Sequence, residues 1–428
     1  MLTETPPYRG VFFLAKSLAM HNPTHHHTRK LLVASTVITV TLTFIALWFY
    51  FNHRITPKPL HTNQQTQWVT GYLPAYRHNG REIPFLGAED YAMLTHIAHA
   101  SAIPRPDGTL DTTTNNYLPE SRHQAVQTTH TNQRPILLVI AAHHDLFSPA
   151  IQAGTRQALI RNTLQMLDED GYDGVDIDME PVTLDENRDN PDFRAFIHEL
   201  HTALQTRISP LLGRPPLLTA ATTLRDRHII AQLANKFDQI NLMAYDMAQP
   251  HEGWITWFDS PLQNGGLVFP GFSHQVPSIE NWVNAFVETG VPRHKLGLGI
   301  SFDVACWQGG ETTPGEGITQ PRIPWRVAPT YFKRSYAEMH MQNRIPAHYQ
   351  WDETAQMAWF GVDAANPADD MFCNFNDARA IKAKISFARQ QGLGGIMIWE
   401  LALDAALQPD ASVGSRPLRQ VIGDMLQK

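Results

Sequence analysis

Short apolar runs alternate with helical patterns along most of this chain, and that alternation limits its fold more than any other feature. Eight candidate strands follow one another from residue 67 onward: Trp68–Leu73, Thr95–Ala100, Pro135–Ala141, Gly174–Met179, Leu217–Ala221, Gln239–Ala244, Lys295–Ile300 and Gly395–Trp399. Eight strands alternating with helices over residues 67–428 predict an α/β protein with a (β/α)8 TIM barrel. A doubly wound open sheet fits the same spacing, so the alternation alone leaves both architectures open.

The helical patterns between these strands are amphipathic. One apolar stripe recurs at helical spacing and consists of Phe193, Phe196, Ile197, Leu200 and Leu204. Ser278 is typical of a helix N-cap, and a further helix is predicted over Ala378–Gln390. A final amphipathic helix follows the last strand, around Leu418–Leu426.

The interval between the seventh and eighth candidate strands is too long for a simple connection. It runs from Ile300 to Gly395 and leaves room for a small α+β insertion at about residues 303–375. Because the loops after barrel strands form the catalytic face, an insertion here would wall a cleft.

Leu31–Phe51 is an uncharged apolar segment of 21 residues. At ~1.5 Å per residue, a helix of this length spans the roughly 30 Å hydrocarbon core of a bilayer. Its end, WFYFNHR, lacks the small-x-small site of a cleaved signal peptide. More basic residues precede the segment than follow it, so the positive-inside rule places residues 1–30 in the cytoplasm. We therefore expect a single-pass anchor in the cell (inner) membrane, a linker at 52–66 and an extracytoplasmic, periplasmic domain at 67–428.

The composition excludes some classes of protein. The net charge of −7, with no long charged runs, argues against a nucleic-acid partner, which requires a basic face. With 43% hydrophobic and 18% charged residues, the chain has the composition of a globular protein with a sizeable core. Its two cysteines, Cys306 and Cys373, lie in the predicted exported part, where a disulfide is permitted, but the sequence leaves their pairing open.

The densest chemistry lies in the fourth candidate strand. Apolar residues alternate there with Asp176, Asp178 and Glu180, so the three acids share one face. In a closed barrel the apolar face meets the outer helices, and the acids point inward. Crowded carboxyls cannot all ionise, so at least one keeps its proton, and Glu180 at the C-terminal mouth of the strand is the candidate general acid. Asp173 has the opposite parity and is predicted to cap or bend the strand entrance.

Three other interpretations compete at this strand. An antiparallel strand with one wet face shows the same alternation. A calcium loop starting at Asp176 would need Gly and an acid where Pro181 and Asn187 stand. A metal-dependent glycosyltransferase could use Asp176 and Asp178, although no Gly-rich phosphate cradle accompanies them.

The spacing Asp173-x-x-Asp176-x-Asp178-x-Glu180 resembles the signature of family 18 glycoside hydrolases, the chitinase family. Two further motifs resemble that family in the right order. Lys236–Met247 resembles its sixth strand with a Met-x-Tyr-Asp motif, and Gly392–Leu401 resembles its eighth strand with a substrate-floor tryptophan. The resemblance covers Gln67–Asp404 in outline and, with the predicted anchor, implies a membrane-anchored bacterial type.

This resemblance implies a chitinase-like hydrolase of β-1,4-linked N-acetylglucosamine polymers that retains configuration through an oxazolinium intermediate. It assigns proton donation to Glu180, acetamide orientation to Asp178, proton sharing to Asp176 and acetamide positioning to Tyr245. The implied substrate contacts are Tyr72, Met243, Asp246, Trp399 and Asp173. No metal or organic cofactor is implied, and the expected partner is an oligo- or polysaccharide containing N-acetylglucosamine, bound by a monomer.

The chain departs from the family pattern near the cleft. The third strand ends in Ile140–His144 instead of Ser-x-Gly-Gly, the second has Ala100-Ser101 where an aromatic is common, and the seventh ends in Ser301–Asp303 without Tyr-Gly-Arg. These changes concern substrate preference, and they leave His143 and His144 open as subsite residues or metal ligands. A catalytically silent glycan-binding protein on the same barrel, or an envelope hydrolase acting on peptidoglycan or glycoprotein glycans, remains the alternative.

Overall fold

The computed structural model describes residues 67–77, 86–184, 189–271, 273–405 and 416–426. The predicted tail, anchor and linker at residues 1–66 lie outside these ranges. Within them, no helix combines the length and the apolar character needed to cross a bilayer.

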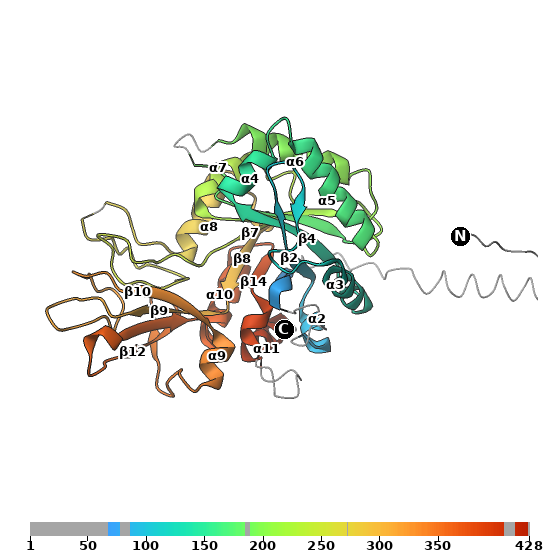
Figure 1. Cartoon of the computed structure of the whole chain (residues 1–428). Coiled ribbons are helices and arrows are strands. Elements are labelled where there is room, and N and C mark those ends of the chain that lie inside the picture. The colour runs from blue at the N-terminus through green and yellow to red at the C-terminus, as the bar shows by residue number, and fades with distance from the viewer. Residues whose placement is uncertain (1–66, 78–85, 185–188, 272, 406–415, 427–428) are drawn as a thin grey trace, which may run out of the picture. The chain divides into compact units, whose positions relative to one another are not determined.

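Eight parallel strands close into a barrel (Figure 1). They are β1 (Trp68–Pro74), β2 (His96–Pro104), β4 (Ile136–His143), β5 (Gly174–Glu180), β6 (Leu217–Thr222), β7 (Gln239–Leu242), β8 (Leu296–Ser301) and β14 (Gly395–Trp399). Closure follows because β1 pairs with β14 on one side and with β2 on the other. The predicted TIM barrel is thereby confirmed, and the open-sheet alternative is excluded. A short strand, β3 (Leu110–Asp111), adds antiparallel to the end of β2.

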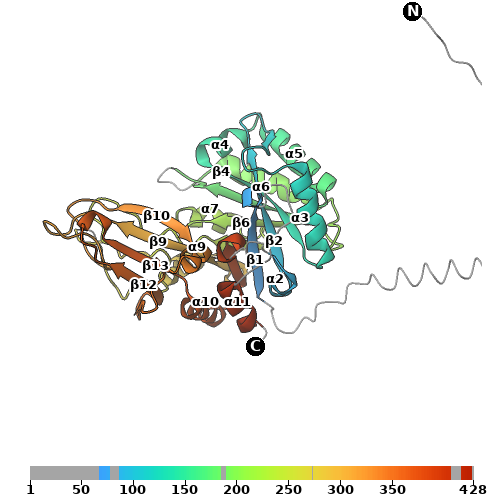
Figure 2. The ribbon, with the colours of Figure 1, turned by 60° about the horizontal axis from the view of Figure 1, so that its bottom comes forward.

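Helices surround the barrel (Figures 1 and 2). They are α2 (Ala88–Met93), α3 (Pro119–Thr131), α4 (His144–Ala150), α5 (Arg156–Asp170), α6 (Pro191–Leu204), α7 (Arg227–Leu233), α8 (Ile279–Glu288), α10 (Ala378–Gln390) and α11 (Pro417–Leu426). The predicted apolar stripe of α6 is buried along its whole length. The Ser278 side chain accepts a hydrogen bond from the Asn281 amide, which caps α8 as predicted.

A second sheet lies between β8 and β14 in the sequence. It contains five antiparallel strands in the order β10-β9-β13-β12-β11. Their bounds are β9 (Asp303–Gln308), β10 (Thr330–Ser335), β11 (Gln350–Asp352), β12 (Met357–Val362) and β13 (Met371–Phe375), with α9 (Tyr336–Met341) after β10. We call residues 303–375 the insertion module. Because β9 starts directly after barrel strand β8, the module is attached at the end of the barrel where active sites form.

The two cysteines are joined. Cys306 on β9 and Cys373 on β13 lie opposite each other in the sheet and form a disulfide across 67 residues of sequence. Both residues are fully buried in the module. The structure thus answers the question that the sequence left open.

Removing this bond should destabilise the protein. A cross-link that closes a loop of 67 residues restricts the unfolded chain by about 4 kcal/mol in the loop-entropy model. We therefore expect the double variant Cys306→Ala and Cys373→Ala to unfold at a clearly lower urea concentration than the oxidised parent. Reduced parent protein is the control and should unfold near the variant; a variant as stable as the oxidised parent would contradict the expectation.

Candidate active site

Strand β5 carries three acids into the barrel interior. Its apolar residues Val175, Ile177 and Met179 belong to the core under the outer helices. The residues between them therefore face inward, and Asp176 and Asp178 are buried there, while Glu180 at the end of the strand is partly exposed.

Asp176 lies deepest and is held from both sides. The Tyr72 hydroxyl on β1 donates to its Oδ2 at 2.6 Å, and the Thr219 hydroxyl on β6 donates to its Oδ1. Burial raises the pKa of Asp176 above its ordinary range, although these two hydrogen bonds oppose the shift. Tyr72, predicted as a substrate contact, is itself buried, and its hydroxyl is engaged in the hydrogen bond to the Asp176 carboxyl.

Asp178 and Glu180 form an interacting pair of carboxyls. Burial raises the pKa of Asp178 well above its ordinary range, and the neighbouring charges of Glu180 and Asp176 raise it further. Burial also raises the pKa of Glu180, while the nearby His143 lowers it. Two carboxyls this close cannot both ionise cheaply, so the pair keeps one proton to a higher pH than an isolated carboxyl. Such a pair supplies a proton and a negative charge side by side.

One oxygen of this pair is unsatisfied. Asp178 Oδ1 is buried and accepts no hydrogen bond from any residue that the structure describes. A buried acceptor without a donor costs about 1–3 kcal/mol, so the position favours a ligand that brings a hydrogen-bond donor.

Aromatic and sulfur side chains surround the acids. Tyr72, Met243 and Tyr245 pack together inside the barrel, and Trp399 lies against this group. The ring centres of Tyr72 and Trp399 are 5.7 Å apart. Burial, followed by the charges of Asp178 and Glu180, raises the pKa of Tyr245 well above its ordinary value, so its hydroxyl keeps its proton and can donate. The structure thus gathers four predicted site residues around the acids.

Asp246 follows Tyr245 and lies at the edge of the cleft. Its side chain is 48% exposed and forms an ion pair with Lys333 Nζ of the insertion module at 2.6 Å. Sequence reasoning missed Lys333, because an isolated lysine in an inserted strand carries no motif and lies 87 positions from Asp246.

Asp173 lies apart from the other acids of the motif. It precedes β5 and is fully buried at the opposite end of the strand from Glu180. Its carboxylate accepts hydrogen bonds from the Ser209 hydroxyl at 2.6 Å and from the Ile136 and Leu211 amides at 3.0 Å, and it contacts His130 Nε2 at 2.7 Å. These bonds occupy both carboxylate oxygens and fit the structural role at the strand entrance that the parity suggested, while the predicted substrate contact stays a prediction.

Asp173→Ala should therefore reduce stability and leave catalysis unchanged. It would strip four polar groups of their partner inside the protein, and we expect a loss of about 3–5 kcal/mol in the free energy of unfolding. Urea denaturation measures the loss, and kcat at a temperature where the variant is still folded should stay near the parent value. A large fall in kcat with normal stability would instead support the predicted substrate contact of Asp173.

His143 and His144 flank the end of β5. His143 Nδ1 lies 3.4 Å from the Glu180 carbonyl oxygen, and His144 Nδ1 lies 3.0 Å from the Pro181 carbonyl oxygen. In the part of the chain that the structure describes, no three His, Cys, Asp or Glu side chains are grouped to hold a metal ion. His143 lies close enough to Glu180 to lower the pKa of that carboxyl.

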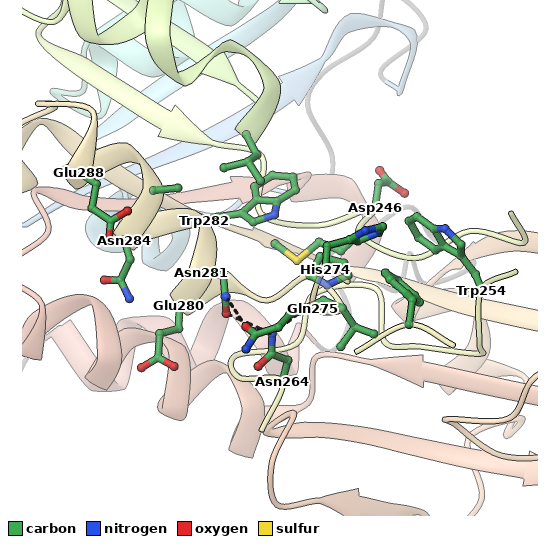
Figure 3. Close-up of a pocket in the computed structure, with 16 residues that line it drawn as sticks. Asp246, Trp254, Asn264, His274, Gln275, Glu280, Asn281, Trp282, Asn284 and Glu288 are labelled. Carbon is green, nitrogen blue, oxygen red and sulfur yellow. Dashed lines mark hydrogen bonds between the residues drawn. The ribbon is translucent and has the colours of Figure 1, made fainter. Parts of the chain in front are cut away.

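A large cavity of about 980 Å³ begins at Asp246 and continues along α8 (Figure 3). Trp254 and Trp282 line it together with several amide side chains and two glutamates. Tryptophan faces and amides are suited to sugar rings and their hydroxyl groups. Of the predicted site residues, Met243 and the β5 acids are not in its lining, whereas Asp246 is.

Comparison with known proteins gives a consistent result. Residues 68–404 match the model of "Glycosyl hydrolases family 18". Chitotriosidase-1 of Mus musculus is 28% identical over 289 residues, which cover 62% of this chain and 57% of that protein. The matched part thus spans little more than half of this relative's length.

Solved structures agree on the fold. A family 18 N-acetylglucosaminidase from Paenibacillus barengoltzii is 22% identical with a TM-score of 0.66, over 84% of this chain and 99% of that chain. Human YKL-39, described as a pseudo-chitinase with retained chitooligosaccharide binding, is 18% identical with a TM-score of 0.67, over 85% of this chain and 100% of that chain. One barrel architecture therefore occurs both in an enzyme and in a pseudo-enzyme.

Proposed function

The chain belongs to family 18 of the glycosyl hydrolases, and from this premise we propose that it hydrolyses β-1,4-linked N-acetylglucosamine oligo- and polysaccharides with retention of configuration. The observation that carries the proposal is the buried, unpartnered Asp178 Oδ1 beside Glu180. The N–H of an N-acetyl group is a donor of the kind that this oxygen lacks. A sugar with this substituent would satisfy the acceptor and bring its anomeric carbon to the acid.

In the first step, Glu180 donates its proton to the glycosidic oxygen as the bond from that oxygen to the anomeric carbon breaks. The carbonyl oxygen of the substrate's own acetamide forms the new bond to the anomeric carbon, which gives an oxazolinium ion. Asp178 accepts the acetamide N–H and, as a carboxylate, stabilises the positive charge that develops there. The proton that the pair holds in the free enzyme therefore resides on Glu180 when substrate is bound.

In the second step, the Glu180 carboxylate takes a proton from water, whose oxygen attacks the anomeric carbon and opens the oxazolinium ring. Two displacements at the same carbon retain its configuration. Tyr245 supports both steps because its protonated hydroxyl can donate to the acetamide carbonyl and hold it in line. Trp399, partly exposed beside Tyr72, offers a flat face for the sugar ring.

Location and assembly are part of the same proposal. We propose that Leu31–Phe51 anchors the chain in the cell membrane, that the barrel acts outside the cytoplasm, and that the protein is a monomer. The apolar length of the segment and the basic residues before it support the anchor.

The test uses the full chain in detergent with N-acetylglucosamine tetramer and, separately, with muropeptides. We expect shorter N-acetylglucosamine oligomers from the tetramer, identified by mass spectrometry. Cleavage of muropeptides alone would shift the proposal to a peptidoglycan hydrolase. Tetramer binding without cleavage of either substrate would favour a silent glycan-binding protein, as human YKL-39 illustrates.

A further inference from the structure

A lysine of the insertion module reaches the catalytic face of the barrel. Lys333 lies on β10, and its side chain is only 21% exposed. Its Nζ lies 2.6 Å from Asp246 Oδ1, 3.3 Å from Asp259 Oδ1 and 3.5 Å from Asp303 Oδ2. It also lies 5.8 Å from the centre of the Tyr245 ring. One ammonium group therefore contacts two predicted site residues and two further acids.

These three carboxylates come from separate parts of the chain. Asp246 and Asp259 lie in the long connection between β7 and α8, whereas Asp303 begins β9 directly after barrel strand β8. Lys333 thus joins the module's strand β10 to the ends of two barrel strands.

Asp246 needs such support because its backbone is held in an uncommon conformation. Its φ of +56° lies in the left-handed region, which few residues other than glycine, asparagine and aspartate adopt. The Asp246 amide donates to Asp259 Oδ1 at 3.2 Å, so Asp259 fixes the backbone of the turn while Lys333 fixes the side chain.

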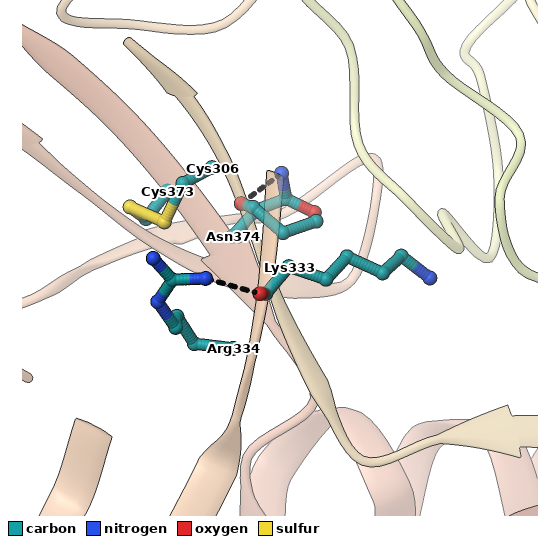
Figure 4. Close-up of a disulfide and its surroundings, with 6 residues drawn as sticks. Cys306, Lys333, Arg334, Cys373 and Asn374 are labelled. Atoms are coloured by element: carbon teal, nitrogen blue, oxygen red, sulfur yellow. Dashed lines mark hydrogen bonds between the residues drawn. A yellow bond between two sulfur atoms is a disulfide. The ribbon is translucent and has the colours of Figure 1, made fainter. Parts of the chain in front are cut away.

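The module also holds Asp259. The Tyr331 hydroxyl on β10 donates to Asp259 Oδ1 at 3.0 Å, and the Asp259 amide donates to Asn374 Oδ1 on β13 at 2.8 Å. Tyr331, Lys333 and Asn374 belong to the face of the sheet that turns away from the disulfide. Figure 4 shows Lys333 extending from the sheet while Arg334, next in sequence, lies on the disulfide side.

We propose that Lys333 is a positioning residue for the reaction, so that the insertion module completes the active site. The inference rests on the proposed function. Lys333 keeps Asp246 ionised and aimed at the cleft edge, and it fixes the Asp246 turn directly after Tyr245. The ring of Tyr245 is thereby held where its hydroxyl can align the acetamide.

The charges around Lys333 support a fixed positive charge. Burial by itself would lower the pKa of Lys333, but Asp259, Asp246 and Asp303 together outweigh it and raise the pKa. In turn, Lys333 opposes the burial that raises the pKa of Asp246 and of Asp303. Without the ammonium group, both acids would therefore bind protons at higher pH than in the parent.

Three variants of the full chain test the proposal. Lys333→Met keeps the length of the side chain and removes the charge, Lys333→Arg keeps the charge, and Arg334→Met is the matched control. Arg334 is exposed on the other face of the same strand, and its guanidinium donates to the Lys333 carbonyl oxygen and stacks on Phe332. Each variant is assayed for kcat and KM on N-acetylglucosamine tetramer across pH, and for its melting temperature.

We expect Lys333→Met to lower kcat/KM by about 100-fold, the size of effect that a small misplacement of site groups produces. The acidic limb of its pH profile should move to higher pH, because Asp246 then protonates more readily. Lys333→Arg should recover most of the loss, and Arg334→Met should stay within about threefold of the parent.

Some results would overturn the inference. One is a Lys333→Met variant whose kcat/KM and pH profile equal those of the parent. The other is an Arg334→Met variant that loses as much kcat/KM as Lys333→Met does. If the parent itself does not cleave the tetramer, the proposed function fails, and the positioning role must be tested by binding alone. Tetramer affinity by calorimetry then decides, and equal affinity of parent and Lys333→Met would overturn the positioning role.

Discussion

Glu180→Gln should reduce tetramer turnover by about 10³- to 10⁴-fold, because it removes the proton that the leaving oxygen needs. General acid catalysis is worth about this much at the upper end of its range. The glutamine fills the same volume at the end of β5 and removes a carboxyl whose pKa burial raises, so the variant should fold as well as the parent. The measurement is kcat on N-acetylglucosamine tetramer, together with the melting temperature.

An exposed glutamate outside the site provides the control for this variant. Glu120 lies in the first turn of α3, and Glu120→Gln makes the same chemical change without touching the cleft. Its kcat should equal that of the parent. A Glu180→Gln variant that is as active as Glu120→Gln would remove Glu180 from the mechanism.

Asp178→Asn should separate activity from stability. An asparagine keeps the shape of the side chain but loses the charge that stabilises the acetamide in the transition state. We expect kcat to fall by about 10²- to 10³-fold, which is the loss seen when one fixed electrostatic contact is removed from a site of this kind. The assay is the same tetramer hydrolysis.

The stability of this variant should change in the opposite direction. The folded protein raises the pKa of Asp178. The contribution of this carboxyl to the stability of the parent is therefore full below the ordinary aspartate pKa and is lost as pH rises through the raised value. Asparagine does not ionise, so Asp178→Asn should resist urea better than the parent at pH 8, while the two should differ less at pH 4. A variant that is less stable than the parent at both pH values would show that burying the ionised Asp178 carboxylate does not reduce the stability of the parent.

Much of the barrel was predictable because its signals are local. Each of the eight strands is a short apolar run, and the predicted bounds differ from the observed ones by a few residues at most. The sixth of them, Gln239–Ala244, ends at Leu242 in the structure. The alternation of acids on β5 follows from the two-residue period of a strand, so it placed Asp176, Asp178 and Glu180 on one face without knowledge of the neighbours.

What the sequence did not reveal depends on contacts between distant segments. Asp173 lies within the acidic motif, yet its partners His130, Ser209 and Leu211 come from other elements, and only the structure shows that they take up its oxygens. Lys333 and Asn374 act on Asp246 and Asp259 from across the insertion module, where no spacing rule connects them. The pairing of Cys306 with Cys373 likewise required the order of the module's strands.

The anomer that forms first distinguishes attack by the substrate's acetamide from direct attack by water. Proton NMR of the full chain with N-acetylglucosamine tetramer, recorded before mutarotation, distinguishes the two configurations at the new reducing end. Attack by the substrate's own acetamide, positioned by Asp178, predicts the β anomer. Initial release of the α anomer would mean that water attacks directly, which would contradict the roles assigned here to Asp178 and Glu180.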